Sequence, residues 1–309
     1  MAAARAVVFA YHDVGVRCLL ALLSADIEIP LVVTVADDPH ETRWFGSVAD
    51  TAAEHDLRVV RPADPNTGEL AQTLSELQPD FIFSFYYRAL LGGALLRTAA
   101  RGALNMHGSL LPKYRGRAPV NWAILRGEKE TGATLHYMVE RADAGDIVDQ
   151  LAVPILHEDN AQEVFRKVTV AAETVLARSL PALLAGTAPR RSQPPAPGEY
   201  FGRRRPEDGQ IDWSRSAQEI HNLVRAVAPP FPAAFTTIRS QRWWLHATRV
   251  EPAMRQPAAA AQLTGEQGRC LIICRDGSVL RLLAAVTAAG PVDLAAVAQA
   301  AQKSPVTLQ

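Results

Sequence analysis

Short apolar runs alternate with amphipathic segments through the first half of the chain. The runs have the length and β-branched content of buried strands, and the segments between them space their apolar residues as on one face of a helix. The strand-like runs are residues 6–11, 29–35, 57–60, 80–85 and 103–107, and the helix-like segments are residues 16–23, 45–55 and 69–77. This alternation predicts a Rossmann-like α/β fold, in which a mostly parallel sheet carries helices on both faces.

The pattern changes in the second half. Residues 161–184 repeat apolar positions near the helical period, and prolines and glycines then become frequent and predict an extended linker. One further helix is predicted at residues 217–227, and short strands at residues 233–238, 242–250, 269–274 and 279–285. Short strands of this kind are typical of a small β-barrel. We therefore predict a first domain at residues 1–186, a linker at 187–199 and a C-terminal barrel domain at 200–309.

The composition argues against several classes of protein. Lysine plus arginine and aspartate plus glutamate each number 32 in the 309 residues, so the formal net charge is zero. A nucleic-acid binder usually carries a basic excess, so we expect no nucleic-acid partner. No apolar run approaches the roughly 18 residues of a membrane helix, so we expect no membrane insertion. Three sparse cysteines and the absence of a secretory signal pattern indicate reduced thiols and a cytoplasmic location.

Nucleotide cofactors and metals are not predicted. The turn after the first strand reads Tyr11-His12-Asp13-Val14-Gly15, which lacks the glycine fingerprint of dinucleotide sites and the phosphate loop of ATP sites. The pair Cys270 and Cys274 has no second cluster to complete a zinc site. Spacing typical of a metal site is also missing around His40, His55, His157, His221 and His246. We therefore expect no NAD and no metal ion.

A run of polar residues between Asn105 and Asp146 carries the candidate chemistry. Asn105 and His107 are two positions apart on a predicted strand, so their side chains leave the same face. Both lie at the carboxyl end of that strand, where sites form in parallel sheets. An amide donor beside an imidazole suits a carbonyl oxygen that becomes negative during a reaction. A carboxylate from a later loop, Asp143, could hold or charge that imidazole.

Several motifs along the chain together resemble one enzyme family. They are Asn105-x-His107, Ser109-Leu110-Leu111-Pro112, Arg115-Gly116, Thr131-Gly132-Ala133-Thr134, Asp143-Ala144-Gly145, Phe9-Ala10-Tyr11-His12-Asp13, Phe83-Ser84-Phe85-Tyr86-Tyr87-Arg88, Phe201-Gly202-Arg203-Arg204 and Asn222-Leu223-Val224-Arg225-Ala226-Val227. In this combination they are similar to the 10-formyltetrahydrofolate-dependent formyltransferases. Within that family the chain most resembles the ArnA-type branch, which formylates UDP-4-amino-4-deoxy-L-arabinose in lipid A modification and polymyxin resistance. The decarboxylase region of such enzymes has no counterpart here, so we expect another polypeptide to supply the substrate.

The resemblance implies roles for individual residues. It makes His107 the proton donor and Asn105 and Asp143 the groups that stabilise the transition state, with Asp143 able to raise the pKa of His107. Arg117 is implied to bind the nucleotide sugar. Folate is implied to bind through main-chain groups of Ala89-Leu90-Leu91 and Val139-Glu140-Arg141-Ala142-Asp143. His136 is present in sugar-type relatives, and we interpret it as a subfamily marker without a catalytic role. Whether His107, Asp143 or a bound water deprotonates the incoming ammonium stays open.

The acceptor stays open too. Another nucleotide amino sugar, such as a dTDP-4-amino hexose, fits the same motifs. A methionyl-tRNA formyltransferase would need a basic insertion near the first helix, whereas residues 37–47 are short and contain Asp37, Asp38 and Glu41. A nucleic-acid-binding module could use Arg242, Trp243 and Trp244 as a stacking platform, although we expect these side chains to pack the barrel against the catalytic domain. The family implies that this barrel is open and OB-like.

Overall fold

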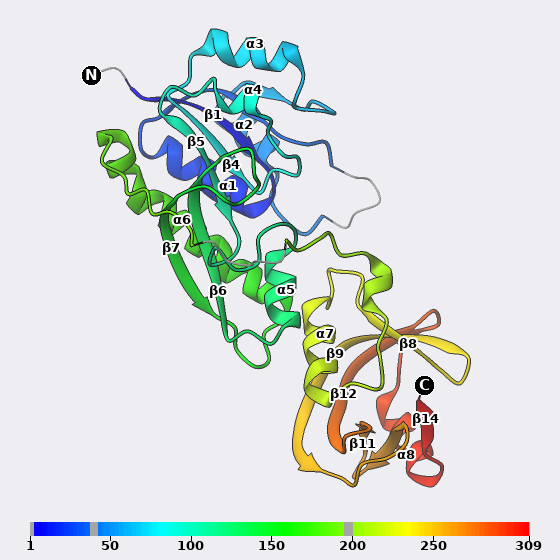
Figure 1. Ribbon diagram of the computed structural model, residues 1–309. Coiled ribbons are helices and arrows are strands. Elements are labelled where there is room, and N and C mark those ends of the chain that lie inside the picture. Colours follow the sequence, from blue (N-terminus) through cyan, green and yellow to red (C-terminus); the bar gives the residue numbers. More distant parts are fainter. Residues whose placement is uncertain (1–2, 38–42, 195–199, 309) are drawn as a thin grey trace. The chain divides into compact units, whose positions relative to one another are not determined.

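The first sheet is built from the apolar runs of the first half of the chain. The computed structural model describes residues 3–37, 43–194 and 200–308, and within them this sheet has seven strands in the order β3-β2-β1-β4-β5-β6-β7 (Figure 1). The strands are β1 (Arg5–Ala10), β2 (Glu28–Val33), β3 (Val59–Val60), β4 (Phe81–Phe85), β5 (Gly102–His107), β6 (Glu130–Tyr137) and β7 (Ile147–Pro154). The first five pair in parallel, and β6 and β7 pair antiparallel to their neighbours. The predicted mostly parallel sheet is confirmed.

Helices lie on both faces of this sheet. Those of this part of the chain are α1 (His12–Leu23), α2 (Val48–Glu54), α3 (Gly68–Leu77), α4 (Gly93–Leu96), α5 (Pro119–Leu125) and α6 (Ala161–Ala185). Helices α3 and α4 cover one face, and α1 and α6 cover the other (Figure 1). Ser47 and Thr67 begin α2 and α3, because each side-chain oxygen accepts a backbone N–H of the first turn. The predicted Rossmann-like arrangement is therefore confirmed.

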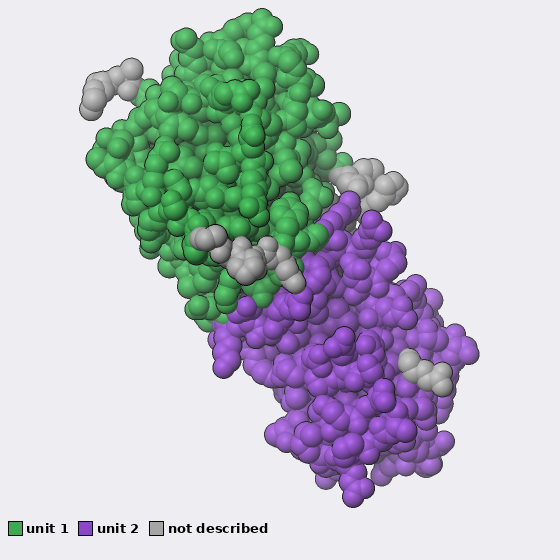
Figure 2. All heavy atoms as spheres, in the orientation of Figure 1, with its two compact units in different colours: residues 1–119, 130–154, 165–202 green, residues 120–129, 155–164, 203–309 purple. Residues whose placement is uncertain are grey.

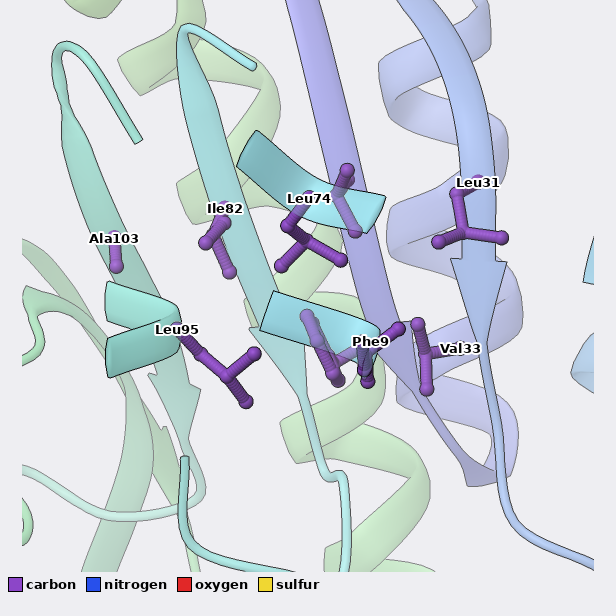
Figure 3. Close-up of a cluster of buried hydrophobic side chains, with 9 residues drawn as sticks. Phe9, Leu31, Val33, Leu74, Ile82, Leu95 and Ala103 are labelled. Atoms are coloured by element: carbon purple, nitrogen blue, oxygen red, sulfur yellow. The ribbon is translucent and has the colours of Figure 1, made fainter. Parts of the chain in front are cut away.

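A cluster of apolar side chains fills the space between the sheet and helices α3 and α4. Figure 3 shows strand residues facing helix residues in this cluster: Phe9, Leu31, Val33, Ile82 and Ala103 on the strands, and Leu74 and Leu95 on the helices. All of them are at most 5% exposed. Burying a large apolar side chain contributes roughly 1.5–3 kcal/mol. The cluster therefore makes the central strands a rigid frame for the residues at their carboxyl ends.

Helix α6 is long and apolar enough to cross a membrane by length and composition, and no other helix among the described residues is. Half of its most apolar window is buried inside the protein, and Val168, Val175 and Leu176 are fully buried. Glu173 of this helix forms an ion pair with Arg17 of α1. A buried core helix meets the same two criteria, so α6 is weak evidence for a membrane span.

The second sheet lies in the C-terminal part of the chain and is antiparallel. Its strands are β8 (Ala234–Ile238), β9 (Gln241–Met254), β10 (Ala261–Glu266), β11 (Arg269–Ile273), β12 (Ser278–Thr287), β13 (Gly290–Pro291) and β14 (Val306–Leu308). They follow the order β14-β10-β11-β12-β9-β8, with β13 beside β12, in a nearly closed, barrel-like sheet. The short helix η1 (Pro206–Gly209) precedes this sheet, and helices α7 (Ala217–Ala226) and α8 (Leu294–Lys303) pack against it. The predicted C-terminal β-barrel is confirmed.

The aromatic and basic side chains of β9 pack on the barrel. Trp243 is 7% exposed, and the guanidinium of Arg242 lies 3.9 Å from the centre of the Phe235 ring. Phe235 also pairs directly with Trp244 across the ladder between β8 and β9. Trp243 is thus buried, and Arg242 is held over Phe235, so these two side chains do not form an open stacking surface.

The chain forms two compact units, and the second is discontinuous in sequence. Residues 1–119, 130–154 and 165–202 form the first unit, and residues 120–129, 155–164 and 203–309 form the second (Figure 2). Within the second unit, the Asn121 side chain donates to the carbonyl of Ala226 over 2.7 Å, and Arg225 donates to the carbonyl of Asp159 over 3.2 Å. Residues 187–309 therefore do not make up the second unit by themselves. A domain boundary at Gly186 stays a prediction about which segments fold on their own.

Candidate active site

Two paired strands position the first three groups of the site. Asn105 and His107 lie on β5, and Asn105 is directly opposite His136 in the antiparallel ladder between β5 and β6. Directly opposed residues project to the same face of a sheet, so all three side chains meet on one face. The sheet changes from parallel to antiparallel pairing at β5, which has β4 on one side and β6 on the other. The polar side chains thus gather at that junction.

His107 is buried, and both of its ring nitrogens face polar groups. Its Nε2 lies 2.8 Å from the carbonyl oxygen of Tyr114, and because a carbonyl only accepts, Nε2 carries the hydrogen. Its Nδ1 lies 3.6 Å from Oδ1 of Asp143. Burial lowers the pKa of His107 and outweighs the raising effect of the Asp143 carboxylate. Asp143 raises the pKa of His107, as expected, but burial lowers that pKa by more. The net shift is therefore downward, and the imidazole is neutral near pH 7.

Asp143 arrives from the turn between β6 and β7, as predicted for a later loop. Its Oδ2 accepts the backbone N–H of Gly116 over 2.8 Å, and its Oδ1 lies 3.6 Å from Nδ1 of His107 and 3.6 Å from Nε2 of His136. Burial alone would raise the pKa of this carboxyl, but the two imidazoles and the Gly116 N–H outweigh burial and lower the pKa. Asp143 is therefore an ionised, hydrogen-bonded carboxylate at neutral pH.

His136 connects Asn105 to the carboxylate. It is 1% exposed, and its Nδ1 lies 2.9 Å from the carbonyl oxygen of Tyr137, so Nδ1 carries the hydrogen in the neutral ring. Its Nε2 then accepts from the Asn105 side-chain amide over 3.1 Å. Asn105, His107, His136 and Asp143, hereafter the polar cluster, form a continuous chain of contacts. The second N–H of the Asn105 amide has no partner among the described residues.

The comparison with known families bears directly on this cluster. A family model described as formyl transferase matches residues 6–180, and a model described as formyl transferase, C-terminal domain, matches residues 203–295. The chain belongs to the formyl transferase family. It is therefore an enzyme that transfers formyl groups, as the sequence motifs predicted, and the whole polar cluster lies within the first match.

Solved structures share the fold of this formyl transferase. The N-formyltransferase from Helicobacter canadensis, solved with folinic acid and dTDP-3-aminofucose, has a TM-score of 0.71 at 20% identity over 91% of this chain and 99% of that chain. WlaRD, a sugar 3N-formyltransferase solved with dTDP and 5-N-formyl-THF, has a TM-score of 0.71 at 19% identity, covering 95% and 99% of the two chains. Glycinamide ribonucleotide transformylase 1 from Symbiobacterium toebii has a TM-score of 0.53 at 22% identity, covering 62% and 93%.

The two segments predicted to bind folate expose apolar side chains. Leu90 is 69% exposed and Val139 is 48% exposed. Asn66 holds the turn that contains Leu90, because its side chain donates to the Leu90 carbonyl over 3.0 Å and accepts from the Gly92 N–H over 2.6 Å. The second segment approaches the start of α4, just after the first segment, since a Cβ on Gly93 would lie 3.2 Å from Oε1 of Glu140.

Arg117 lies beside the first of these segments and outside the polar cluster. Its guanidinium donates to the carbonyl of Arg88 over 2.7 Å, and its backbone N–H donates to the carbonyl of Phe201 over 2.8 Å. The side chain is on the exposed surface of the formyl transferase. An exposed guanidinium held at one end by a carbonyl keeps other N–H groups for an anionic ligand.

Three residues in or beside the polar cluster were not among the predicted catalytic or binding residues. His136 was interpreted as a subfamily marker, whereas the structure places it between Asn105 and Asp143. Arg115 and Gln193 contact the Asp143 turn through their side chains. The alternating pattern of residues 134–138 identifies a strand, but the partner that lies opposite His136 depends on how the strands pair. No sequence signal links Gln193 to Asp143.

Among the described residues, one group of possible metal ligands lies within the second unit. The ligand atoms of His157, Glu158 and His221 lie within 4.8 Å of one another, although their sequence spacing does not resemble a metal site. His221 already uses both ring nitrogens, since Nδ1 lies 3.0 Å from Oγ1 of Thr248 and Nε2 lies 3.1 Å from the His157 carbonyl oxygen. Glu158 is within 3.3 Å of the Arg249 guanidinium. A cation would have to displace these partners, so the group fits a hydrogen-bonded network better than a metal site.

Gly108 follows His107 and has no room for a side chain. A Cβ at this position would lie 1.8 Å from the hydroxyl oxygen of Tyr86, whose ring is packed against Phe165. We expect Gly108→Ala to lower the free energy of unfolding by roughly 1–3 kcal/mol through overpacking. We also expect kcat to fall by about tenfold, because the neighbouring His107 must shift. Denaturant unfolding and steady-state kinetics measure the two effects.

Gly68→Ala is the matched control. A Cβ at Gly68 would meet nothing within 4 Å, so this change should leave stability and kcat nearly unchanged. The double variant Gly108→Ala/Tyr86→Phe should recover part of the loss, because the hydroxyl oxygen is gone. Equal stability of the Gly108→Ala and Gly68→Ala variants would contradict the overpacking at Gly108.

Proposed function

We propose that this formyl transferase moves a formyl group from 10-formyltetrahydrofolate to the amine of a nucleotide-linked amino sugar. The observation that carries the proposal is the polar cluster, in which an amide donor, a neutral imidazole and an ionised carboxylate are in contact on one sheet face. Attack of an amine on a formyl group requires a donor for the oxygen and an acceptor for the proton. The cluster offers both within a few ångströms.

The proposed steps assign one task to each group. The amine attacks the formyl carbon as the free base, and the second N–H of Asn105 donates to the oxygen as it becomes negative. Because His107 is neutral at rest, its Nδ1 can accept the proton that the amine loses. Asp143 then stabilises the imidazolium from 3.6 Å. When the bond from the formyl carbon to N10 of the folate breaks, His107 returns the proton to N10, and tetrahydrofolate leaves.

The exposed apolar side chains support a folate donor. A pterin ring is flat, and its edge carries hydrogen-bonding groups, so it suits a site with aliphatic side chains and main-chain donors and acceptors. Leu90 and Val139 offer such aliphatic surface within the two segments proposed to bind it, residues 89–91 and 139–143. The structures from Helicobacter canadensis and of WlaRD contain folinic acid and 5-N-formyl-THF, which are folates.

We propose the 4-amino group of UDP-4-amino-4-deoxy-L-arabinose as the acceptor, and lipid A modification with polymyxin resistance as the role. The support is the motif resemblance described above. A second candidate is a dTDP-linked amino hexose, which the dTDP-3-aminofucose and dTDP in the two sugar formyltransferase structures favour. The three cysteines are free and buried, which fits the proposed cytoplasmic location.

Mass spectrometry of the products tests the donor and the acceptor together. The purified protein is incubated with 10-formyltetrahydrofolate and, in separate reactions, with UDP-4-amino-4-deoxy-L-arabinose, dTDP-3- and dTDP-4-amino hexoses, and methionyl-tRNA. We expect the largest kcat/KM for the UDP-linked pentose. A larger kcat/KM for a dTDP-linked sugar would identify that sugar as the acceptor, and the proposed mechanism would still hold. Formylation of methionyl-tRNA alone would overturn the proposal of a sugar acceptor.

Arg117→Ala tests the proposed contact with the nucleotide. A charge-assisted hydrogen bond is worth about 1.5–3 kcal/mol, so we expect KM for the nucleotide sugar to rise by about 10- to 100-fold. KM for the folate should rise by less, although Arg117 lies beside the folate segment through the Arg88 carbonyl. Arg58, an exposed arginine before β3, provides the control, and Arg58→Ala should leave both KM values unchanged. An equal or larger rise for the folate would assign Arg117 to the folate site.

A further inference from the structure

Residues 190–193, predicted as part of a linker, lie against the turn that carries Asp143. Arg191 pairs with Ile147 through two backbone hydrogen bonds of 2.8 and 3.0 Å. The guanidinium of Arg190 lies 3.8 Å from the centre of the Tyr137 ring, and Ser192 donates to Oδ1 of Asp146 over 3.1 Å. These contacts bind the segment to both ends of the turn between β6 and β7.

The side-chain amide of Gln193 is fully used at this turn. Its Nε2 donates to the carbonyls of Asp143 and Gly145 over 2.9 and 2.8 Å. Its Oε1 accepts from Arg115, over 2.5 Å from Nη2 and 3.2 Å from Nε. An amide has two N–H donors, and both are taken by backbone carbonyls of the turn. Gln193 therefore cross-links Arg115 to the backbone on each side of Ala144.

Arg115 depends on this cross-link because it is buried. Its side chain is 6% exposed, and its guanidinium donates to uncharged oxygens of Gln193 and Asp143. A buried charge that loses a hydrogen-bond partner is strongly destabilised and moves or becomes hydrated. Loss of the Gln193 side chain would therefore displace Arg115.

The residues on either side of Arg115 hold two members of the polar cluster. The carbonyl of Tyr114 accepts from Nε2 of His107, and the N–H of Gly116 donates to Oδ2 of Asp143. Asp143 itself has a φ of +53°, a conformation that its surroundings must hold in place. A displaced Arg115 would thus shift the supports of the imidazole and of the carboxylate together.

We propose that Gln193 is a positioning residue for formyl transfer, which holds Arg115 and the Asp143–Gly145 turn so that Asp143 stays beside His107. The proposal rests on the proposed function, because it concerns the geometry of that reaction. Displacement of a catalytic group by about 1 Å can lower a rate by about 100-fold. Gln193→Ala should therefore lower kcat by about 10- to 100-fold, while KM for the folate and for the sugar stays within about threefold.

Three further variants separate positioning from general disruption. Gln193→Glu keeps an oxygen that can accept from Arg115, but its second oxygen cannot donate to the carbonyls of Asp143 and Gly145. Its kcat should therefore fall as far as that of Gln193→Ala. Ser192→Ala is the matched control on the same segment, and we expect its kcat to stay within about twofold of the wild type. In an Asp143→Asn background, Gln193→Ala should add little further loss, because the carboxylate that it positions is already gone.

An amide measurement tests the same contact without any turnover. The Gly116 N–H donates to Asp143, so hydrogen exchange at Gly116 should be at least about tenfold faster in Gln193→Ala and unchanged in Ser192→Ala. The Val8 amide in the core strand β1 serves as the internal reference for global opening. Faster exchange at Gly116 alone, together with the kcat loss, supports the proposal. Unchanged exchange, unchanged kcat, or additive losses in the Asp143→Asn background would overturn it.

If the wild type forms no product with any acceptor, the proposed function fails, and the Gly116 exchange still reports on the cross-link.

Discussion

His107→Ala is expected to lower kcat by about 10³-fold, because general acid–base catalysis by a positioned side chain contributes 10²–10⁴-fold. The substitution removes the imidazole whose Nδ1 lies 3.6 Å from Oδ1 of Asp143, at the carboxyl end of β5. KM for both substrates should change little, since the proposed role of His107 is in proton transfer and not in binding. Steady-state kinetics and calorimetric titration of the folate measure the two quantities separately.

The pH profile of the wild type gives the same claim a second test. Burial lowers the pKa of His107 below its ordinary value of 6.5, so the neutral ring persists to lower pH than in an exposed histidine. If the neutral ring accepts the amine's proton, kcat falls as pH drops through that lowered pKa, and the acid limb lies below pH 6.5. His55→Ala, at the exposed end of α2, is the control and should keep kcat and the acid limb. A His107→Ala variant within about tenfold of the wild-type kcat would show that His107 is not the proton carrier.

Asn105→Ala is expected to lower kcat by about 10²–10³-fold, the usual cost of removing one donor to a developing oxyanion. The substitution also leaves Nε2 of the buried His136 without its donor, so the free energy of unfolding should fall by about 1–3 kcal/mol. Folate affinity should persist, because Asn105 is proposed to act on charge that exists only in the transition state.

The two effects of Asn105→Ala are separated by measuring kcat well below the unfolding midpoint. At that temperature a stability loss of this size leaves nearly all molecules folded, and the kcat loss then reports on chemistry alone. Asn160→Ala is the control for an asparagine lost from a structural position, since its side chain accepts the N–H of Glu163 at the start of α6. That control should lose stability and keep kcat. A kcat of Asn105→Ala within about fivefold of the wild type would show that the Asn105 amide does not stabilise the transition state.

The central strands and the shared strand face of two candidate site residues were predictable from the sequence because those features are local. Period-2 spacing places Asn105 and His107 on one face, and the structure has them so on β5. The residues that support them come from elsewhere in the chain. His136 is opposite Asn105 through antiparallel pairing, and Gln193 lies against the Asp143 turn although its surroundings have the composition of a linker. Neither contact is encoded in spacing or composition.

The C-terminal barrel shows the same limit. Strand β10 (Ala261–Glu266) and helix α8 (Leu294–Lys303) were not predicted, because β10 follows an alanine-rich patch and contains a glycine. The structure explains why residue 265 is a glycine, because a Cβ there would lie 1.8 Å from the carbonyl oxygen of Ala298 in α8. Close approach of the helix backbone requires the glycine that weakens the strand pattern. Tertiary packing, not local propensity, thus defines strand β10.

Transfer of an isotopically labelled formyl carbon is the most direct test of the central claim. The wild type and the His107→Ala and Asn105→Ala variants receive labelled 10-formyltetrahydrofolate and UDP-4-amino-4-deoxy-L-arabinose, and NMR follows the labelled carbon. The polar cluster predicts that the label moves to the sugar nitrogen in the wild type, and that both variants, although folded and bound to folate, transfer it at least about 100-fold more slowly. Transfer at the wild-type rate in both variants would place the chemistry somewhere other than the polar cluster.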